Sequence, residues 1–145
     1  MITTQRRMRS LVTLGAALTL GIAGVQHGLT TEASAARANP VIVKVTLRDY
    51  GVAMSRHALP AGAPIRFVIT NHGKAMHETV LERAGADDKA LEVRGKEYEA
   101  DDIAPGTTRT VTWTIPQAGT YQLACHMPGH FEMGMMTRFT VTGSR

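Results

Sequence analysis

Residues 125–136 read Cys125-His126-Met127-Pro128-Gly129-His130-Phe131-Glu132-Met133-Gly134-Met135-Met136. They include the only cysteine of the chain, two of its six histidines and four of its eight methionines. Thiolate and thioether sulfur, together with imidazole nitrogen, form a ligand set that suits copper. Cys125 can end a strand, the Pro128-Gly129 turn can bring His130 back beside it, and Met135 can reach the same point. Two histidines, a cysteine and a weak axial methionine form a known copper site, so the chain must supply one more histidine.

The missing histidine is best sought upstream of this stretch, among His57, His72 and His77. His77 begins a strand-like segment, residues 77–81, directly after a turn at residues 71–74. A histidine at the mouth of a neighbouring strand can project toward the cysteine loop. His72 lies within the turn and is expected to be solvated, and His57 lies in a strand-like segment with no identifiable partner. We therefore favour His77.

The first 38 residues resemble an export signal rather than part of a folded domain. Arg6, Arg7 and Arg9 precede an apolar run over residues 11–25, and small residues offer cleavage points after Ala35 or Ala38. These features are typical of a secretory signal peptide, and an uncleaved N-terminal anchor is the alternative. Either the general secretory or the twin-arginine route is compatible with the sequence. Residues 1–38 are thus predicted to be removed, which places the protein in the periplasm or outside the cell.

The remaining residues, 39–145, suffice for a single domain with one hydrophobic core. The whole chain has a formal net charge of +4, which gives no reason to expect binding to nucleic acid. A lone cysteine in an exported protein has no internal disulfide partner. It must therefore be buried, reactive or bound to a metal.

Alternation of apolar and polar residues predicts an all-β domain. The alternating segments are residues 41–47, 65–70, 110–115, 121–125 and 137–141, and turn-forming residues such as Pro105-Gly106 separate them. Segments 51–59 and 77–81 bring the total to about seven strands, which favours a β-sandwich.

Residues 82–102 depart from this alternation. The segment contains eight Asp or Glu and four Lys or Arg, and the rest of the domain is correspondingly basic. We expect a solvated excursion between strands, with a short helix at residues 87–94. A docking element for a partner is the alternative.

These motifs resemble those of the cupredoxins, the small blue-copper proteins that include plastocyanin, azurin and rusticyanin. The matching sequences are Asn71-His72-Gly73, His77-Glu78, Ile103-Ala104-Pro105-Gly106, Val111-Thr112-Trp113, Gly119-Thr120-Tyr121 and Cys125-x2-Pro128-Gly129-His130-x3-Gly134-Met135. The resemblance covers residues 71–141, and the copper loop is highly specific. It implies a Greek-key β-sandwich or barrel with one type 1 copper ion per chain. The implied ligands are His77, Cys125, His130 and Met135, with a His-to-Met spacing similar to that of rusticyanin.

Neighbouring residues leave alternatives for the copper site. Met133 and Met136 compete with Met135 for the axial position, although strand parity turns Met136 away from the core and favours Met135. Glu78 stands where many cupredoxins carry an asparagine that ties this strand to the cysteine loop.

The pair Cys125-His126 also resembles the last copper motif of multicopper oxidases. That motif needs a histidine on each side of the cysteine, whereas Ala124 precedes it here, and the chain has no His-x-His pair. We therefore expect no enzymatic activity. Alternation turns His126 away from the face of Cys125, so it is not predicted to be a ligand.

The resemblance implies an exported, monomeric electron carrier that docks weakly and transiently to redox proteins such as a cytochrome or an oxidase. No contact with nucleic acid is expected, and none with a membrane once the signal is cleaved. The surface around His130 would be apolar, formed by Met127, Pro128, Phe131 and Met136. The alternative is a copper-handling protein for storage, delivery or resistance, because His126, Met127, Met133 and Met136 are extra donors beside the site.

Overall fold

The structure, a computed structural model, describes residues 39–143. This part of the chain is all-β, as predicted, and none of it forms a helix that is long and apolar enough to cross a membrane. The predicted signal peptide, including His27, lies outside the described residues. The strands of the described chain are β1 (Val41–Arg48), β2 (Gly51–Met54), β3 (Ala58–Pro60), β4 (Pro64–Asn71), β5 (His77–Arg83), β6 (Glu92–Val93), β7 (Lys96–Glu97), β8 (Glu99–Ile103), β9 (Thr108–Thr114), β10 (Gly119–Ala124) and β11 (Met136–Thr142).

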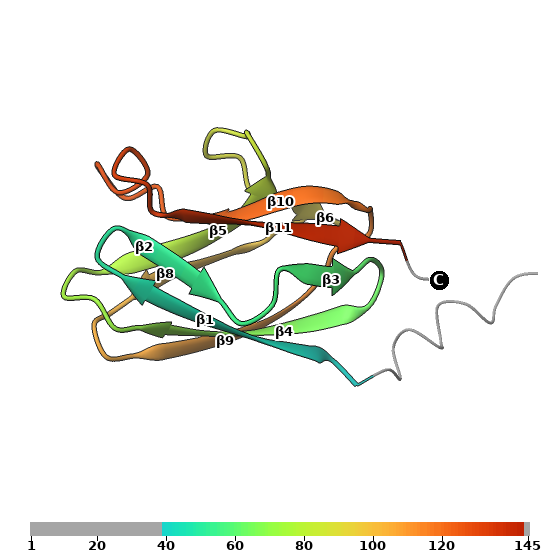
Figure 1. The fold of residues 1–145 in the computed structure, drawn as a ribbon, viewed down its shortest axis with the longest axis horizontal. Helices are drawn as coiled ribbons and strands as arrows, with labels where there is room; N and C mark the ends of the chain where they lie inside the picture. The colour runs from blue at the N-terminus through green and yellow to red at the C-terminus, as the bar shows by residue number, and fades with distance from the viewer. Residues whose placement is uncertain (1–38, 144–145) are drawn as a thin grey trace, which may run out of the picture.

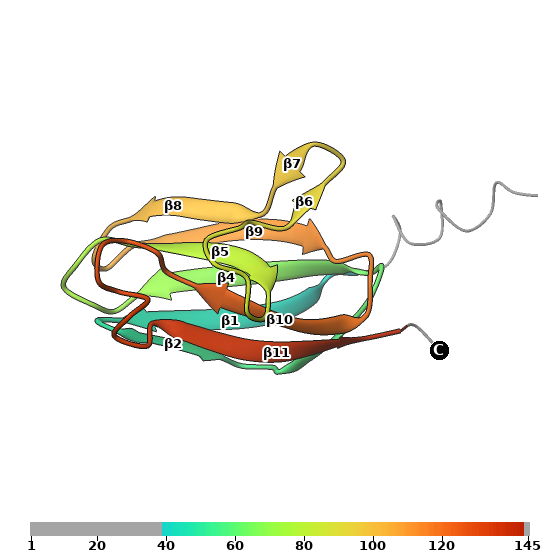
Figure 2. The ribbon, with the colours of Figure 1, turned by 90° about the horizontal axis from the view of Figure 1, so that it is seen from above.

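Two facing sheets make up the sandwich (Figures 1 and 2). Sheet A has the order β2-β1-β4-β9 and sheet B the order β3-β11-β10-β5-β8, while β6 and β7 form a separate hairpin. β1 runs parallel to β4, and β3 runs parallel to β11. The other neighbours within the two sheets are antiparallel. The chain crosses repeatedly between the sheets, because consecutive strands such as β2 and β3, or β4 and β5, belong to different sheets.

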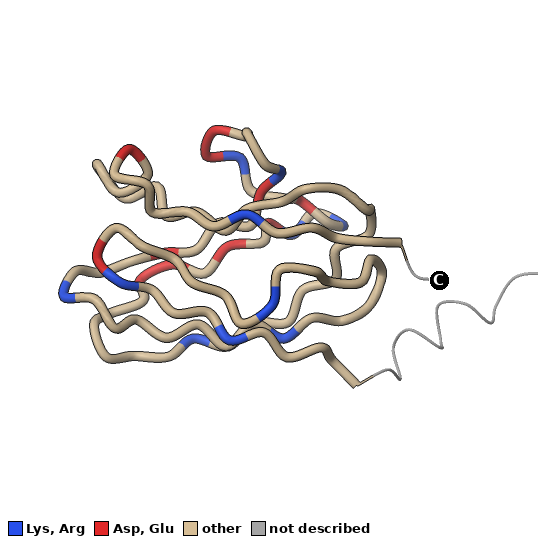
Figure 3. The backbone as a smooth tube through the Cα atoms, viewed as in Figure 1, with Lys and Arg blue, Asp and Glu red and all other residues tan. Residues whose placement is uncertain are grey.

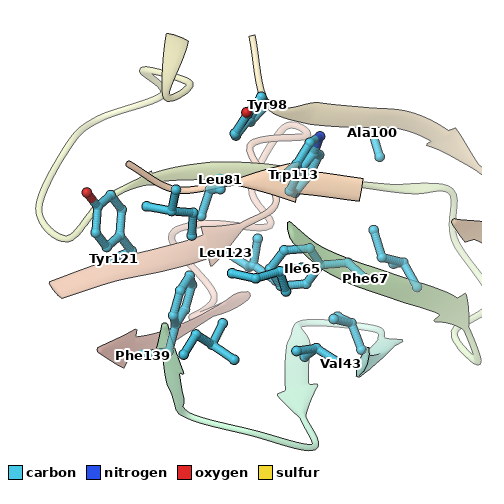
Figure 4. Close-up of a cluster of buried hydrophobic side chains, with 14 of the residues drawn as sticks. Val43, Ile65, Phe67, Leu81, Tyr98, Ala100, Trp113, Tyr121, Leu123 and Phe139 are labelled. Carbon is cyan, nitrogen blue, oxygen red and sulfur yellow. The ribbon is translucent and has the colours of Figure 1, made fainter. Parts of the chain in front are cut away.

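The alternating apolar residues fill the space between the sheets, because successive side chains of a strand point to opposite faces. Figure 4 shows part of this core, with side chains from both sheets directed toward one another. Each fully buried aliphatic or phenylalanine side chain contributes roughly 1.5–3 kcal/mol to the stability of the fold through burial of its apolar surface. The buried residues of the predicted segments include Val43, Val45, Leu47, Ile65, Phe67, Ile69, Trp113, Ile115, Tyr121, Leu123, Phe139 and Val141.

Segment 51–59, predicted as one strand, divides between the two sheets. β2 pairs with β1 in sheet A, and β3 pairs with β11 in sheet B. The chain bends at residues 55–57, where the Ser55 amide donates to the Lys44 carbonyl oxygen and the Lys44 amide donates to Ser55 Oγ. This division is one reason why the described chain has more strands than the expected seven or so.

Residues 82–102 are not simply a solvated excursion, and the short helix expected at residues 87–94 is wrong. The segment contains the β6–β7 hairpin, which turns at Arg94 and Gly95 with positive φ angles of 55° and 76°. That combination is typical of a two-residue hairpin turn. Tyr98 is buried, and its ring stacks on that of Trp113 (Figure 4). The ring centroids are 5.4 Å apart. Beyond it, β8 completes the edge of sheet B.

The loops at one end of the sandwich come together from three places in the sequence. The β1–β2 turn, the β4–β5 loop and the β10–β11 loop lie at the end opposite the first and last described residues (Figures 1 and 2). Charge is divided between the layers: the strands of sheet A carry only basic charged residues, whereas acidic residues gather on β5, β8 and the segment between them (Figure 3).

Candidate metal centre

Three predicted ligands meet at this loop end. Nδ1 of His77 lies 3.2 Å from Nδ1 of His130, and Sγ of Cys125 lies 3.3 Å from the same His130 nitrogen. The ligand atoms of the three residues all lie within 4.8 Å of one another, and this is the one such group of His, Cys, Asp or Glu found among residues 39–143. His77 and Cys125 are buried and His130 is half-buried.

His77 is positioned by the end of β4 and the loop that follows it. The buried Asn71 side chain donates hydrogen bonds to the carbonyl oxygens of Ala75, at 2.9 Å, and Ile103, at 2.7 Å. Its Oδ1 accepts the amide of Gly73 at 2.7 Å, which forms a tight side-chain-supported turn. Asn71 therefore fixes the loop at both ends, and His77 enters β5 in one defined orientation.

The β10–β11 loop is held closed by its own backbone. The Cys125 amide donates to the Met135 carbonyl oxygen at 3.0 Å, and the Met135 amide donates to the His130 carbonyl oxygen at 3.0 Å. Met135 is fully buried, whereas Met133 is 63% exposed and Met136 is half-buried. Of the three methionines that compete for the axial position, Met135 is thus the one whose main chain is bonded to two predicted ligands. Its role as a ligand stays a prediction.

Glu78 ties β5 to the cysteine loop, although asparagine is common at this position in cupredoxins. Its Oε1 accepts the backbone amide of His126 at 2.8 Å. The carboxylate therefore supplies the same kind of strand-to-loop link that a side-chain amide would supply.

His126 faces away from Cys125, as alternation along β10 predicts. Its Nε2 lies 3.2 Å from Oε1 of the fully buried Glu82. Its ring stacks on Phe131, with centroids 4.6 Å apart and an interplanar angle of 20°. The imidazole is thus engaged on the outer side of sheet B.

The other upstream histidines lie outside the cluster. His72 is exposed in the β4–β5 loop, as expected for a turn residue. His57 is also exposed, and its Nδ1 lies 2.9 Å from the carbonyl oxygen of Arg138. Of these candidates, the structure brings only His77 to Cys125 and His130.

Two residues at this end were not anticipated from the sequence, and both lie in the β1–β2 turn. Asp49 Oδ1 is 3.4 Å from Nε2 of His77. The Tyr50 ring contacts His130 edge to face, with centroids 5.6 Å apart. No local motif marks either residue, because the contacts depend on how β1 is placed in sheet A.

The environment of the site affects its protonation. Burial lowers the pKa of His77 and nearby His130 lowers it further, while Asp49 acts in the opposite direction. Burial raises the pKa of the Cys125 thiol, against the effect of hydrogen bonds from the backbone of Glu78 and Met127. In the metal-free protein the His77 lone pair is therefore available at neutral pH, and metal binding must displace the thiol proton.

The donor set fits a copper ion. The Nδ1 atoms of the two imidazoles face each other at 3.2 Å, and Sγ of Cys125 lies 3.3 Å from the same His130 nitrogen, so three atoms that can bind a metal through lone pairs converge on one point. A cation at this point could be coordinated by the nitrogens of His77 and His130 and by the thiolate of Cys125. Imidazole, thiolate and thioether together favour copper over the harder divalent cations.

A protein-family model described as a cupredoxin-like domain matches residues 16–137. This chain belongs to the cupredoxin-like domain family. The resemblance inferred from the copper loop is thereby confirmed at the level of the family and of the fold.

Known relatives of this cupredoxin include copper-related proteins. It is 36% identical over 87 residues to the copper-resistant cuproprotein CopI of Rubrivivax gelatinosus, a match that covers 55% of this chain and 53% of the relative. It is 28% identical over 135 residues to CopI of Pseudomonas aeruginosa, covering 68% and 75%. Auracyanin-B of Chloroflexus aurantiacus is 29% identical over 124 residues, covering 72% and 53%. The matched region is thus only about half of the first and third of these relatives.

Solved structures share the fold of this cupredoxin. Reduced auracyanin from Roseiflexus castenholzii superposes with a TM-score of 0.52 and 19% identity, covering 74% of this chain and 99% of that one. Reduced rusticyanin gives a TM-score of 0.52 and 21% identity, covering 72% and 82%. At these identities the likeness concerns the fold alone. Multicopper oxidases also appear among the structures with this fold.

Proposed function

We propose that this cupredoxin is an exported electron carrier with one type 1 copper ion, bound by His77, Cys125 and His130 with Met135 as weak axial ligand. The observation that carries the proposal is the convergence of two imidazole Nδ1 atoms and one thiol within 4.8 Å in a largely buried site. Bound copper supplies a one-electron couple between Cu(II) and Cu(I).

The chain contributes a site that is held in place before any metal binds. Asn71 fixes the loop before His77, Glu78 ties β5 to the cysteine loop, and Met135 closes that loop through its amide and carbonyl groups. Donors fixed in this way need little rearrangement when the charge of the site changes. Such preorganisation suits electron transfer more than it suits release of a metal.

The proposed path for the electron leads through His130, the least buried of the three clustered ligands. Its surroundings expose apolar groups: Tyr50 is 51% exposed and Met133 is 63% exposed. Phe131 and Met127 are half-buried in the same loop. An exposed apolar rim of this kind suits a small, transient interface with a redox protein, burying less than about 1,200 Å². The monomeric state and an extracytoplasmic location belong to the same proposal.

Copper handling is the second candidate, supported by the name of the CopI relatives, which are copper-resistant cuproproteins. Two exposed thioethers belong to segments that carry predicted ligands: Met76, which directly precedes His77 and is 41% exposed, and Met133. Thioethers suit Cu(I) and would form an uptake route or an additional site. His126 is a poorer candidate for this role, because its Nε2 faces Glu82.

The first experiment tests the copper site itself. The purified Cu(II) protein should be intensely coloured through thiolate-to-copper charge transfer, and Cys125→Ser should abolish the colour because Cys125 is the only cysteine. A Cys125→Ser protein that keeps the absorption band would refute the site.

A second experiment separates carrier from handler. A carrier should bind one copper per chain, both in the wild type and in the double variant Met76→Leu/Met133→Leu. Binding of two Cu(I) per wild-type chain, reduced to one in the double variant, would refute the carrier proposal in favour of handling. The rate of copper transfer to a competing chelator, measured for both proteins, checks the same distinction.

A further inference from the structure

The β1–β2 turn reaches both predicted histidine ligands at once. The register Arg48↔Gly51 leaves Asp49 and Tyr50 as the two turn residues. Tyr50 adopts a φ of 64°, which is uncommon for an aromatic residue, so the turn is maintained at some conformational cost. One of its residues lies against His77 and the other against His130.

The Asp49 carboxylate is aimed at His77 by the β4–β5 loop. Its Oδ1 accepts the backbone amides of Lys74, at 2.8 Å, and Ala75, at 3.2 Å. The same oxygen lies 3.4 Å from Nε2 of His77. The two amides hold the oxygen in place independently of the histidine.

Among the described residues, Asp49 provides the only polar group in contact with Nε2 of His77. The atom is buried and makes no well-aligned hydrogen bond. Nδ1 of the same ring is directed toward His130. A small rotation of the ring would bring Nε2–H onto the carboxylate, and coordination through Nδ1 would favour that orientation.

Gly73 leaves room for this contact. A Cβ atom at position 73 would lie 2.5 Å from Asp49 Oδ1 and 2.7 Å from His77 Nε2. Any other residue would push the carboxylate and the imidazole apart. The approach of these two groups is therefore a built feature of the loop.

We propose that Asp49 is a positioning residue of the copper site, whose carboxylate accepts the Nε2–H of His77 and so presents Nδ1 to the metal. A carboxylate behind a ligating histidine fixes its tautomer and raises its basicity. The more basic ligand stabilises Cu(II) more than Cu(I), so Asp49 should lower the reduction potential. The inference rests on the proposed function for its metal and on the observed contacts for its geometry.

The test compares Asp49→Asn with Glu132→Gln. The Asp49→Asn side chain would retain an oxygen that accepts the two backbone amides, so the fold should persist. It would lose the negative charge that faces His77. Glu132 is exposed in the same loop as His130 and controls for the loss of one nearby negative charge. We expect Asp49→Asn to weaken Cu(II) binding about 10- to 100-fold and to raise the potential, and Glu132→Gln to do much less. Equal effects of the two variants would overturn the proposal.

A measurement on the metal-free protein separates this proposal from the copper assignment. Nitrogen-15 NMR of the imidazoles should show His77 mainly as the Nε2–H tautomer in wild type and Glu132→Gln, and as a mixture in Asp49→Asn. An unchanged tautomer in Asp49→Asn would overturn the positioning role. A wild-type protein that shows this tautomer but binds no copper would refute the proposed function and leave the Asp49 contact standing.

Discussion

Replacement of Glu82 should destabilise the protein strongly, because this carboxylate is fully buried on sheet B. Its Oε1 accepts Gln122 Nε2 at 2.6 Å and lies 3.2 Å from His126 Nε2, and its Oε2 accepts the Lys89 amide at 3.2 Å. In Glu82→Ala the side chains of Gln122 and His126 lose this partner while buried, at about 1–3 kcal/mol for each group. We therefore expect a loss of about 3–5 kcal/mol, the range typical of removing one partner from a buried charged pair. That is a large fraction of the roughly 5–15 kcal/mol typical of a domain.

Glu82→Gln should cost less, about 1–3 kcal/mol, because it keeps the volume and one acceptor oxygen. The assay is urea unfolding of the metal-free protein, followed by fluorescence of Trp113, the only tryptophan and a buried one. Glu92→Gln in the exposed part of β6 is the matched control and should stay within about 0.5 kcal/mol of wild type. If Glu82→Ala were as stable as this control, the assignment of a buried hydrogen-bond network would be refuted.

Three further predictions concern the site. His77→Ala should abolish the visible spectrum, while His57→Ala and His72→Ala leave it intact; a large spectral change in His72→Ala would show that the upstream ligand is misassigned. Met135→Leu should retain copper and raise the reduction potential, because a weak axial thioether favours Cu(II) slightly. Met133→Leu should have a smaller effect, and equal shifts of the two potentials in voltammetry would contradict the assignment of Met135 as axial ligand. The metal-free protein should lose stability as the pH falls through 6.5, because the unfolded chain then binds a proton at His77 while the folded chain, in which this pKa is lowered, does not. Urea unfolding at several pH values checks it, and His77→Gln should reduce the slope.

The central strands were predictable because each has one buried face. β1 and β4 show apolar residues at every second position, and the structure buries most of these residues between the sheets, while the edge strand β9 contributes the buried Trp113 and the half-buried Val111. β8 was missed because its burial pattern, exposed at Glu99, Asp101 and Asp102 but buried at Ala100 and Ile103, has no regular period. The irregularity accompanies a register shift against β5, which no single-strand pattern can reveal.

The spacing of the sequence predicted which side chains cluster as possible metal ligands, but it did not predict the residues that hold those ligands in place. Cys125, His130 and Met135 lie in one short loop, so their proximity follows from chain connectivity. Asp49 was not anticipated because it reaches His77 only through the placement of β1 beside β4 in sheet A. The replacement of the usual asparagine by Glu78 was visible in the sequence, but its hydrogen bond to the His126 amide required the structure.

The closure of the β10–β11 loop separates the length of the loop from the pairing of the two strands that carry it. The ladder pairs Ala124 with Met136, and the bond from the Cys125 amide to the Met135 carbonyl oxygen continues it by one step. The residues between Cys125 and Met135 therefore form a loop on a hairpin whose strand pairing is already complete. Its length and composition can therefore change without disturbing the register of either strand. A graft of residues 125–135 should carry Cys125, His130 and Met135 with it, whereas His77 and the acceptor for the His126 amide must come from the β5 strand of the recipient.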